Sequence, residues 1–172
     1  MKLKFGLKWE SRKGKFWLLE CAEHGQWISD GKLTVPKIAL AENYDLRALA
    51  QSTTFAHWEM LTPGEPLSRP GVVVRQDKEC YEIEALVGNT RAVWCRPQML
   101  GNAIAFTWRQ LEHGPSVVLC WASGVSWVTT AMNDRAQAEA EDKLRDVLRL
   151  PAEAAEDATP AEPAAPAEDA TP

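Results

Sequence analysis

Large apolar residues alternate with polar ones at the start of the chain, and this period of two predicts a strand over residues 2–10. Its basic face would carry three lysines, and its buried face would carry Leu3, Phe5, Leu7 and Trp9. Residues 11–14 are typical of a turn, and residues 15–21 predict the returning strand. The N-terminus is therefore expected to form a hairpin with one positive face.

A second hairpin is predicted around Asp30-Gly31, a dipeptide typical of type I′ turns. It would join a strand over residues 26–29 to one over residues 32–40. Pro36 lies inside the second strand and has no N–H to donate, which indicates an edge position or a bulge there.

The apolar period then changes to intervals of three and four, which predicts a helix over residues 43–60 with Asn43 as its N-cap. The periodic positions are Leu46, Leu49, Thr53, Ala56 and Met60. Residues 62–71 contain three prolines and two glycines, so a loop and a possible sub-boundary are expected there.

The second half predicts strands again, at residues 81–87, 104–108, 117–121 and 125–128, with Gly124 as a bulge. A two-residue turn at Gly88-Asn89 would place Glu84 opposite Val93, with Glu82 and Glu84 on one solvated face. A polar helix is expected over residues 134–149. The predicted fold class is therefore α+β, with mostly antiparallel sheet or sheets and two helices, in an order that also permits two β-plus-helix halves.

Composition changes abruptly at Pro151. Residues 151–172 hold six acids, no base, no aromatic residue and no aliphatic side chain larger than Ala, which predicts a disordered acidic tail. Residues 1–150, which hold all 8 tryptophans, are then expected to fold as a single β-rich domain. The tail also accounts for the formal net charge of −5, because the remaining residues carry 19 bases against 18 acids. An anionic partner is thus compatible with the domain.

Four widely spaced cysteines without a Cys-x-x-Cys pair favour free, buried thiols in a reducing compartment over two disulfides in a secreted protein. No apolar run is long enough for a membrane span and none resembles a signal peptide, so a cytoplasmic protein is expected. Cys21-x-x-His24 has the spacing of half a zinc site but lacks a second pair, and phosphate-binding glycine loops are absent, so no cofactor or metal is expected.

The strongest chemical signal is a basic and aromatic cluster at the N-terminus. Cations neutralise phosphates and flat rings stack on unpaired bases, so this combination is typical of single-stranded DNA or RNA binding. The candidate residues are Lys4, Lys8, Arg12, Lys13, Lys15, Phe16 and Trp17. The alternative interpretation is that Phe5 and Trp9 belong to the core and that the lysines form an ordinary solvated strand face.

The same segment resembles a known family. Lys13-Gly14-Lys15-Phe16-Trp17-Leu18-Leu19 is similar to the basic-Gly-basic-Phe turn of PUR repeats, which bind single-stranded nucleic acid with a whirly-like unit of four strands and a helix. The resemblance covers residues 1–45 and implies that Lys13, Lys15 and Phe16 contact the nucleic acid.

Two other function classes remain open at this point. Eight tryptophans are many for one core, so several could be exposed as anchors of a protein-interaction module, such as a phage- or plasmid-type inhibitor or adaptor. An enzyme would need a distant Cys/His pair, or the carboxylates Glu82 and Glu84, to meet in a pocket. The preferred hypothesis is a non-enzymatic single-stranded nucleic-acid-binding protein with an acidic regulatory tail.

Overall fold

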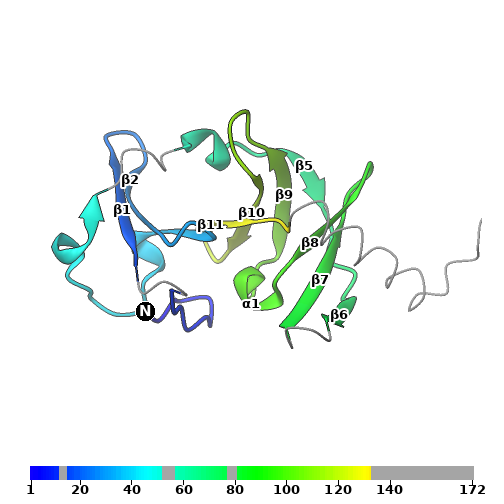
Figure 1. Ribbon diagram of the computed structural model, residues 1–172, viewed down its shortest axis with the longest axis horizontal. Helices are drawn as coiled ribbons and strands as arrows, with labels where there is room; N and C mark the ends of the chain where they lie inside the picture. Colours follow the sequence, from blue (N-terminus) through cyan, green and yellow to red (C-terminus); the bar gives the residue numbers. More distant parts are fainter. Residues whose placement is uncertain (12–14, 52–56, 77–80, 133–172) are drawn as a thin grey trace, which may run out of the picture.

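The computed structural model describes residues 1–11, 15–51, 57–76 and 81–132. The described chain is mostly β, with one short α-helix and three 3₁₀ turns (Figure 1). The elements in order are β1 (Trp17–Cys21), β2 (Gly25–Ser29), β3 (Leu33–Pro36), η1 (Lys37–Ala39), η2 (Leu46–Ala48), β4 (Ala50–Gln51), η3 (Trp58–Leu61), β5 (Glu65–Leu67), β6 (Val73–Gln76), β7 (Tyr81–Val87), β8 (Ala92–Cys95), α1 (Pro97–Leu100), β9 (Ala105–Gln110), β10 (Ser116–Ala122) and β11 (Val125–Thr130).

The strands form two sheets. An 8-stranded mixed sheet has the order β4-β1-β2-β3-β11-β10-β9-β5, and a 3-stranded antiparallel sheet has the order β6-β7-β8. In the larger sheet the β1–β4 pair is parallel and every other pair is antiparallel. Pairing of β3 with β11 joins strands from the two ends of the domain, so the strands before and after the loop at residues 62–71 share one sheet.

The central strands of the large sheet are buried on both faces, which explains their nearly continuous apolar sequences. Alternate residues of β10 enter two separate core clusters: Val118 lies in the larger cluster, and Val117 and Leu119 lie in the smaller one. The larger cluster also contains Leu86 and Val93 from the second sheet. The two sheets therefore share one core, and the smaller cluster lies on the other face of the large sheet.

The alternating N-terminal segment does not form the long strand that its pattern predicts. Leu3 N–H donates to the Leu7 carbonyl at 2.8 Å, and Gly6, at φ +85°, allows the chain to reverse between them. The expected distribution of side chains nevertheless holds, because Leu3, Phe5 and Trp9 are buried while the lysines are exposed. The interpretation of Phe5 and Trp9 as core residues is thus confirmed.

The helix predicted over residues 43–60 is wrong. The described part of this range forms η2, β4 and the start of η3, with Asp45 capping η2 by accepting the Arg47 N–H at 3.1 Å. Leu46 packs into the larger core cluster and Met60 into the smaller one, which lie on opposite faces of the large sheet. The two ends of the predicted helix therefore pack on opposite faces of the large sheet, and β4, which lies between them in the chain, pairs with the edge of that sheet at β1.

Three predicted connections also differ from the structure. The loop at residues 62–71 contains β5, whose Pro66 is tolerated because β5 is an edge strand. Asp30-Gly31 does lie in a hairpin, but only Gly31 has a positive φ, so the turn is not type I′. Gly124 is not a bulge: with Ser123 it forms the two-residue, positive-φ turn between β10 and β11.

The β7–β8 hairpin has a longer turn than the predicted two residues. Val87 pairs with Ala92, and Gly88 N–H donates to the Arg91 carbonyl, so the turn spans four residues and the register shifts. Glu84 consequently lies opposite Cys95 rather than Val93. The predicted helix at residues 134–149 and the tail at residues 151–172 lie outside the described residues. Within the described ranges, no helix is long and apolar enough to cross a membrane.

Candidate functional site

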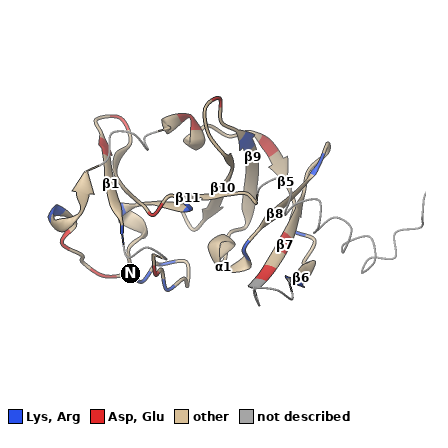
Figure 2. Cartoon of the chain, in the orientation of Figure 1, with Lys and Arg blue, Asp and Glu red and all other residues tan. Residues whose placement is uncertain are grey.

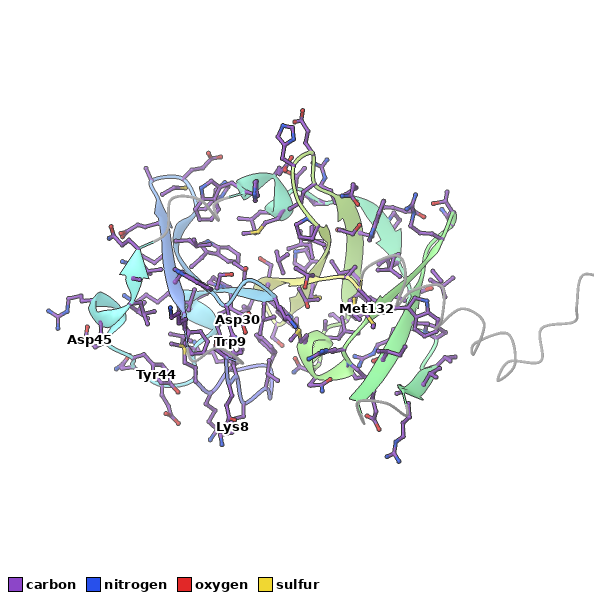
Figure 3. The ribbon with its side chains drawn as sticks, viewed as in Figure 1. Lys8, Trp9, Asp30, Tyr44, Asp45 and Met132 are labelled. Carbon is purple, nitrogen blue, oxygen red and sulfur yellow. The ribbon has the colours of Figure 1, made fainter. Side chains whose placement is uncertain are left out.

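The N-terminal segment is held firmly against the sheet by backbone and side-chain contacts. Its start pairs with the end of η1 and the residue that follows, because Lys4 N–H donates to the Ala39 carbonyl at 2.9 Å and Leu3 bridges to Leu40. The Trp9 indole N–H donates to the Asp30 carboxylate at 2.9 Å, and Figure 3 shows these two side chains close together. These contacts hold the backbone from which the exposed Lys2, Lys4 and Lys8 project.

A stacked pair of aromatic rings, Phe5 and Trp127, holds the same segment against the core. The rings of Phe5 and Trp127 are nearly parallel, at 3° and 3.9 Å between centroids. The Trp127 indole N–H donates to the Met99 carbonyl at 2.9 Å, so this buried polar group has its partner. Because Phe5 is a core residue, the segment cannot leave the sheet without exposing the centre of the larger cluster.

A groove of about 550 Å³ lies beside this segment. Two lysines from different parts of the chain, Lys4 and Lys37, line it, and the Lys37 ammonium donates to the Gln26 side chain at 3.1 Å. The remaining lining residues come from the β1–β2 turn, β2, the end of β3, η1 and the segment that follows η1: His24, Gln26, Pro36, Ile38, Leu40, Glu42, Asn43 and Tyr44. The groove therefore combines cations, an aromatic ring and apolar surface.

Tyr44 and Ile38 provide the flat and apolar surfaces of the groove. The Tyr44 hydroxyl accepts the Lys2 backbone N–H at 2.8 Å, which orients the half-buried phenol ring beside the N-terminal segment. Ile38 is 63% exposed, an unusual state for a large aliphatic side chain. Glu42 is the acidic residue of the lining, and its carboxylate accepts the Tyr44 hydroxyl at 3.5 Å.

The structure distributes the residues predicted from the sequence over several environments. Lys4 lines the groove. Lys8 is exposed and pairs with Glu10 at 2.8 Å, and the hydrogen bond and charge of Glu10 raise the pKa of Lys8. Figure 2 shows the lysines of this segment beside the start of the chain. Lys15 is exposed, whereas Arg12 and Lys13 lie outside the described residues.

The two predicted stacking residues do not line the groove. Phe16 is half-buried and meets the Trp9 ring almost perpendicularly, at 84° and 4.7 Å between centroids. Trp17 is also half-buried, and its backbone pairs with Ser29 on one side and Ala50 on the other. The aromatic residue with access to the groove is instead Tyr44, in a range that sequence reasoning assigned to a helix.

The carboxylates Glu82 and Glu84 do not form the solvated pair that alternation predicted. Glu84 is 2% exposed, and Arg69 holds its carboxylate with two N–H groups, at 2.5 and 2.9 Å. Arg69 also donates to the Gly101 carbonyl at 3.0 Å, and the Glu84 hydrogen bond raises the pKa of Arg69. The prediction of Glu84 on an outer face is therefore wrong: the shared core between the sheets covers it.

The described cysteines and histidines do not assemble a recognisable chemical centre. Cys21, Cys95 and Cys120 are free thiols, and burial raises the pKa of Cys95 to about 12. Across the described ranges, no group of three or more His, Cys, Asp or Glu side chains is placed to hold a metal ion. Comparison with protein-family models, curated proteins and solved structures finds no match to this chain.

Proposed function

We propose that this protein binds single-stranded nucleic acid without catalysis, and that the bound strand follows the groove beside the N-terminal segment. The observation that carries the proposal is the convergence of Lys4, Lys37 and Tyr44 on one groove from separate parts of the chain. Phosphates would pair with the two ammonium groups, while a base would stack on the Tyr44 ring and contact Ile38.

Residues 12–15 follow the anchored N-terminal segment in the chain, and their sequence holds three further cations. Lys15 is exposed, and the Ser11 hydroxyl contacts its backbone, accepting its N–H at 3.1 Å and donating to its carbonyl at 2.8 Å. In this proposal Lys8, Arg12, Lys13 and Lys15 extend the electrostatic contact beyond the groove. The likeness in sequence between residues 13–19 and PUR repeats supports the same ligand class.

The acidic tail has a regulatory role in the proposal. Its six carboxylates, without a single base, would compete with phosphates for the same lysines. Removing residues 151–172 should therefore tighten binding at low salt. Unchanged affinity after this deletion would assign the tail a role outside nucleic-acid binding.

The direct test is fluorescence anisotropy with a labelled oligothymidylate of about 20 nucleotides, longer than the ~4–16 nucleotides that one small domain usually covers. We expect saturable binding that weakens with salt. Each lysine that contacts a phosphate contributes about 0.7 to the slope of log affinity against log salt, so Lys4→Glu and Lys37→Glu should each lower that slope. Arg75→Glu is the matched control, because Arg75 is 82% exposed on β6 in the other sheet.

The ring of Tyr44 is tested separately from the charges. Loss of a stacked base costs ~1–3 kcal/mol, so Tyr44→Leu should weaken binding by roughly 5- to 150-fold. Tyr44→Phe keeps the ring and removes the hydroxyl that accepts the Lys2 N–H, so it should weaken binding much less than Tyr44→Leu does. The proposal fails if no binding occurs at about 50 μM protein in low salt, or if Lys37→Glu weakens binding no more than Arg75→Glu.

The alternative of a protein-interaction module anchored by exposed tryptophans has less support. All eight tryptophans lie in the described residues, and each is buried or half-buried. Affinity capture from lysate with and without nuclease distinguishes the two: partners lost on nuclease treatment favour nucleic-acid binding, and partners retained favour the interaction module.

A further inference from the structure

A second hollow, separate from the groove, lies between the β2–β3 hairpin, η3 and the loop that joins β9 to β10. Its volume is about 150 Å³, and none of its lining residues belongs to the groove. In Figure 1, η3 lies next to the β9–β10 loop, and it contacts β10. The apolar lining is Met60, Leu111, Val117 and Val128.

The polar side chains of the lining are those of Ser29, Lys32, Thr34, His57, His113 and Thr130. Among them, Ser29 and Thr34 are buried and form a pair. Ser29 is 2% exposed and Thr34 is 8% exposed, and their oxygens lie 2.8 Å apart, so one hydroxyl donates to the other. The Ser29 oxygen also accepts the Gly31 N–H at 3.1 Å.

One hydroxyl hydrogen of this pair is left without an acceptor in the described part of the chain. Two hydroxyls carry two hydrogens, and their mutual bond uses one of them. Whichever residue donates, the second hydrogen has no acceptor among the described residues. A buried donor without an acceptor costs free energy, and an acceptor inside the hollow would remove that cost.

We propose that this pocket binds a small apolar molecule, about the size of one aromatic ring with a short substituent, that carries a single hydrogen-bond acceptor. A cavity of about 150 Å³ lined by aliphatic side chains is large enough for benzene. The four apolar side chains would contact the ring, and the spare hydroxyl hydrogen of Ser29 or Thr34 would donate to a carbonyl oxygen. A mostly apolar lining with a few placed polar groups is the usual arrangement of small-molecule sites.

Acetophenone and α-methylstyrene form a matched pair of probes, because they have the same shape and differ in a C=O or C=CH₂ group. Binding is measured on the full chain by ¹³C methyl shifts of Met60, Val117 and Val128. We expect both probes to shift these methyl groups, and acetophenone to bind roughly 5- to 10-fold more tightly, as for one net hydrogen bond.

The substitutions must remove both hydroxyls, because either single variant keeps one donor. Ser29→Ala with Thr34→Val should abolish the preference for acetophenone while leaving α-methylstyrene binding unchanged, which also shows that the pocket remains folded. Leu111→Trp should fill the pocket and exclude both probes. Absence of binding by either probe at millimolar concentration, or equal affinities in the parent protein, would overturn the proposal.

Discussion

The buried ion pair between Arg69 and Glu84 permits a quantitative prediction. Replacing Arg69 with Met leaves the Glu84 carboxylate, which is 2% exposed, without either of the N–H groups that hold it at 2.5 and 2.9 Å. A buried charge that loses its partner costs ~3–5 kcal/mol. We therefore expect Arg69→Met to lower the free energy of unfolding by about 3–5 kcal/mol.

Replacing Glu84 instead of Arg69 should lower the free energy of unfolding by less, because Arg69 is the more exposed of the two side chains. Arg69 is 31% exposed as a side chain, whereas Glu84 is 3% exposed, so the guanidinium can regain water after its partner is removed. Arg69 also keeps its bond to the Gly101 carbonyl at 3.0 Å. Glu84→Gln, which retains an acceptor, should therefore cost ~1–3 kcal/mol.

Urea unfolding followed by tryptophan fluorescence measures these free energies, with eight tryptophans as reporters. The decisive control is the double variant Arg69→Met with Glu84→Leu, because replacing both charges by apolar groups removes the unpaired carboxylate. It should recover most of the stability lost in Arg69→Met. The free energy of unfolding is also measured for Glu84→Leu alone. If the loss in the double variant equals the sum of the losses in Arg69→Met and Glu84→Leu to within about 0.5 kcal/mol, the two side chains are not coupled and the reasoning is refuted.

Three further predictions concern the core and its thiols. Phe5→Ala removes the ring stacked on Trp127 at 3.9 Å and should cost ~3–5 kcal/mol by urea unfolding, and a loss below about 1 kcal/mol would show that the N-terminal segment adds little to the core. Gly101→Ala should cost ~1–3 kcal/mol in the same assay, because Gly101 has φ +52° and a new Cβ would lie 2.8 Å from the Phe5 ring; an unchanged midpoint would contradict this. Burial raises the pKa of Cys95 to about 12 and that of Cys120 well above its usual value, so at pH 8 iodoacetamide should modify them only as the protein unfolds. Mass spectrometry identifies the modified thiols, and rapid labelling of Cys95 in the native state would be inconsistent with the structure.

Several local features could be read from the sequence because they depend on neighbouring residues alone. The strand periods predicted β1, β2 and β10 close to their observed bounds, and alternation correctly assigned Phe5 and Trp9 to the buried side. Steric and hydrophobic preferences of adjacent residues decide these features, so they survive in most tertiary settings.

The candidate groove could be predicted only in part. Lys4 was identified from the basic N-terminal pattern, but Lys37 and Tyr44 were not. Lys37 follows a strand that ends at Pro36, and Tyr44 lies in the segment mistaken for a helix. Nothing local indicates that these residues meet, because pairing of the N-terminal segment with the chain after η1 brings them together.

Glu84 shows the same limit in the second sheet. Alternation with Ile83 and Ala85 suggested a solvated face, but β7 is buried on both faces. Leu86 packs into the core shared with the first sheet, and Ile83 and Ala85 pack into a separate cluster. Its partner Arg69 lies 15 residues away in the chain, so the pairing has no local signature.

By itself, the sequence determined the β-rich character of the domain, the side on which its first aromatic residues are buried, and the concentration of acidic charge after Pro151. Only the tertiary structure decided which lysines share a groove, which carboxylate is buried with an arginine, and where two hydroxyls meet in an apolar pocket. The reason is that period and composition report the preferences of each segment for water, whereas a site depends on which distant segments pair, and that depends on the packing of the whole chain.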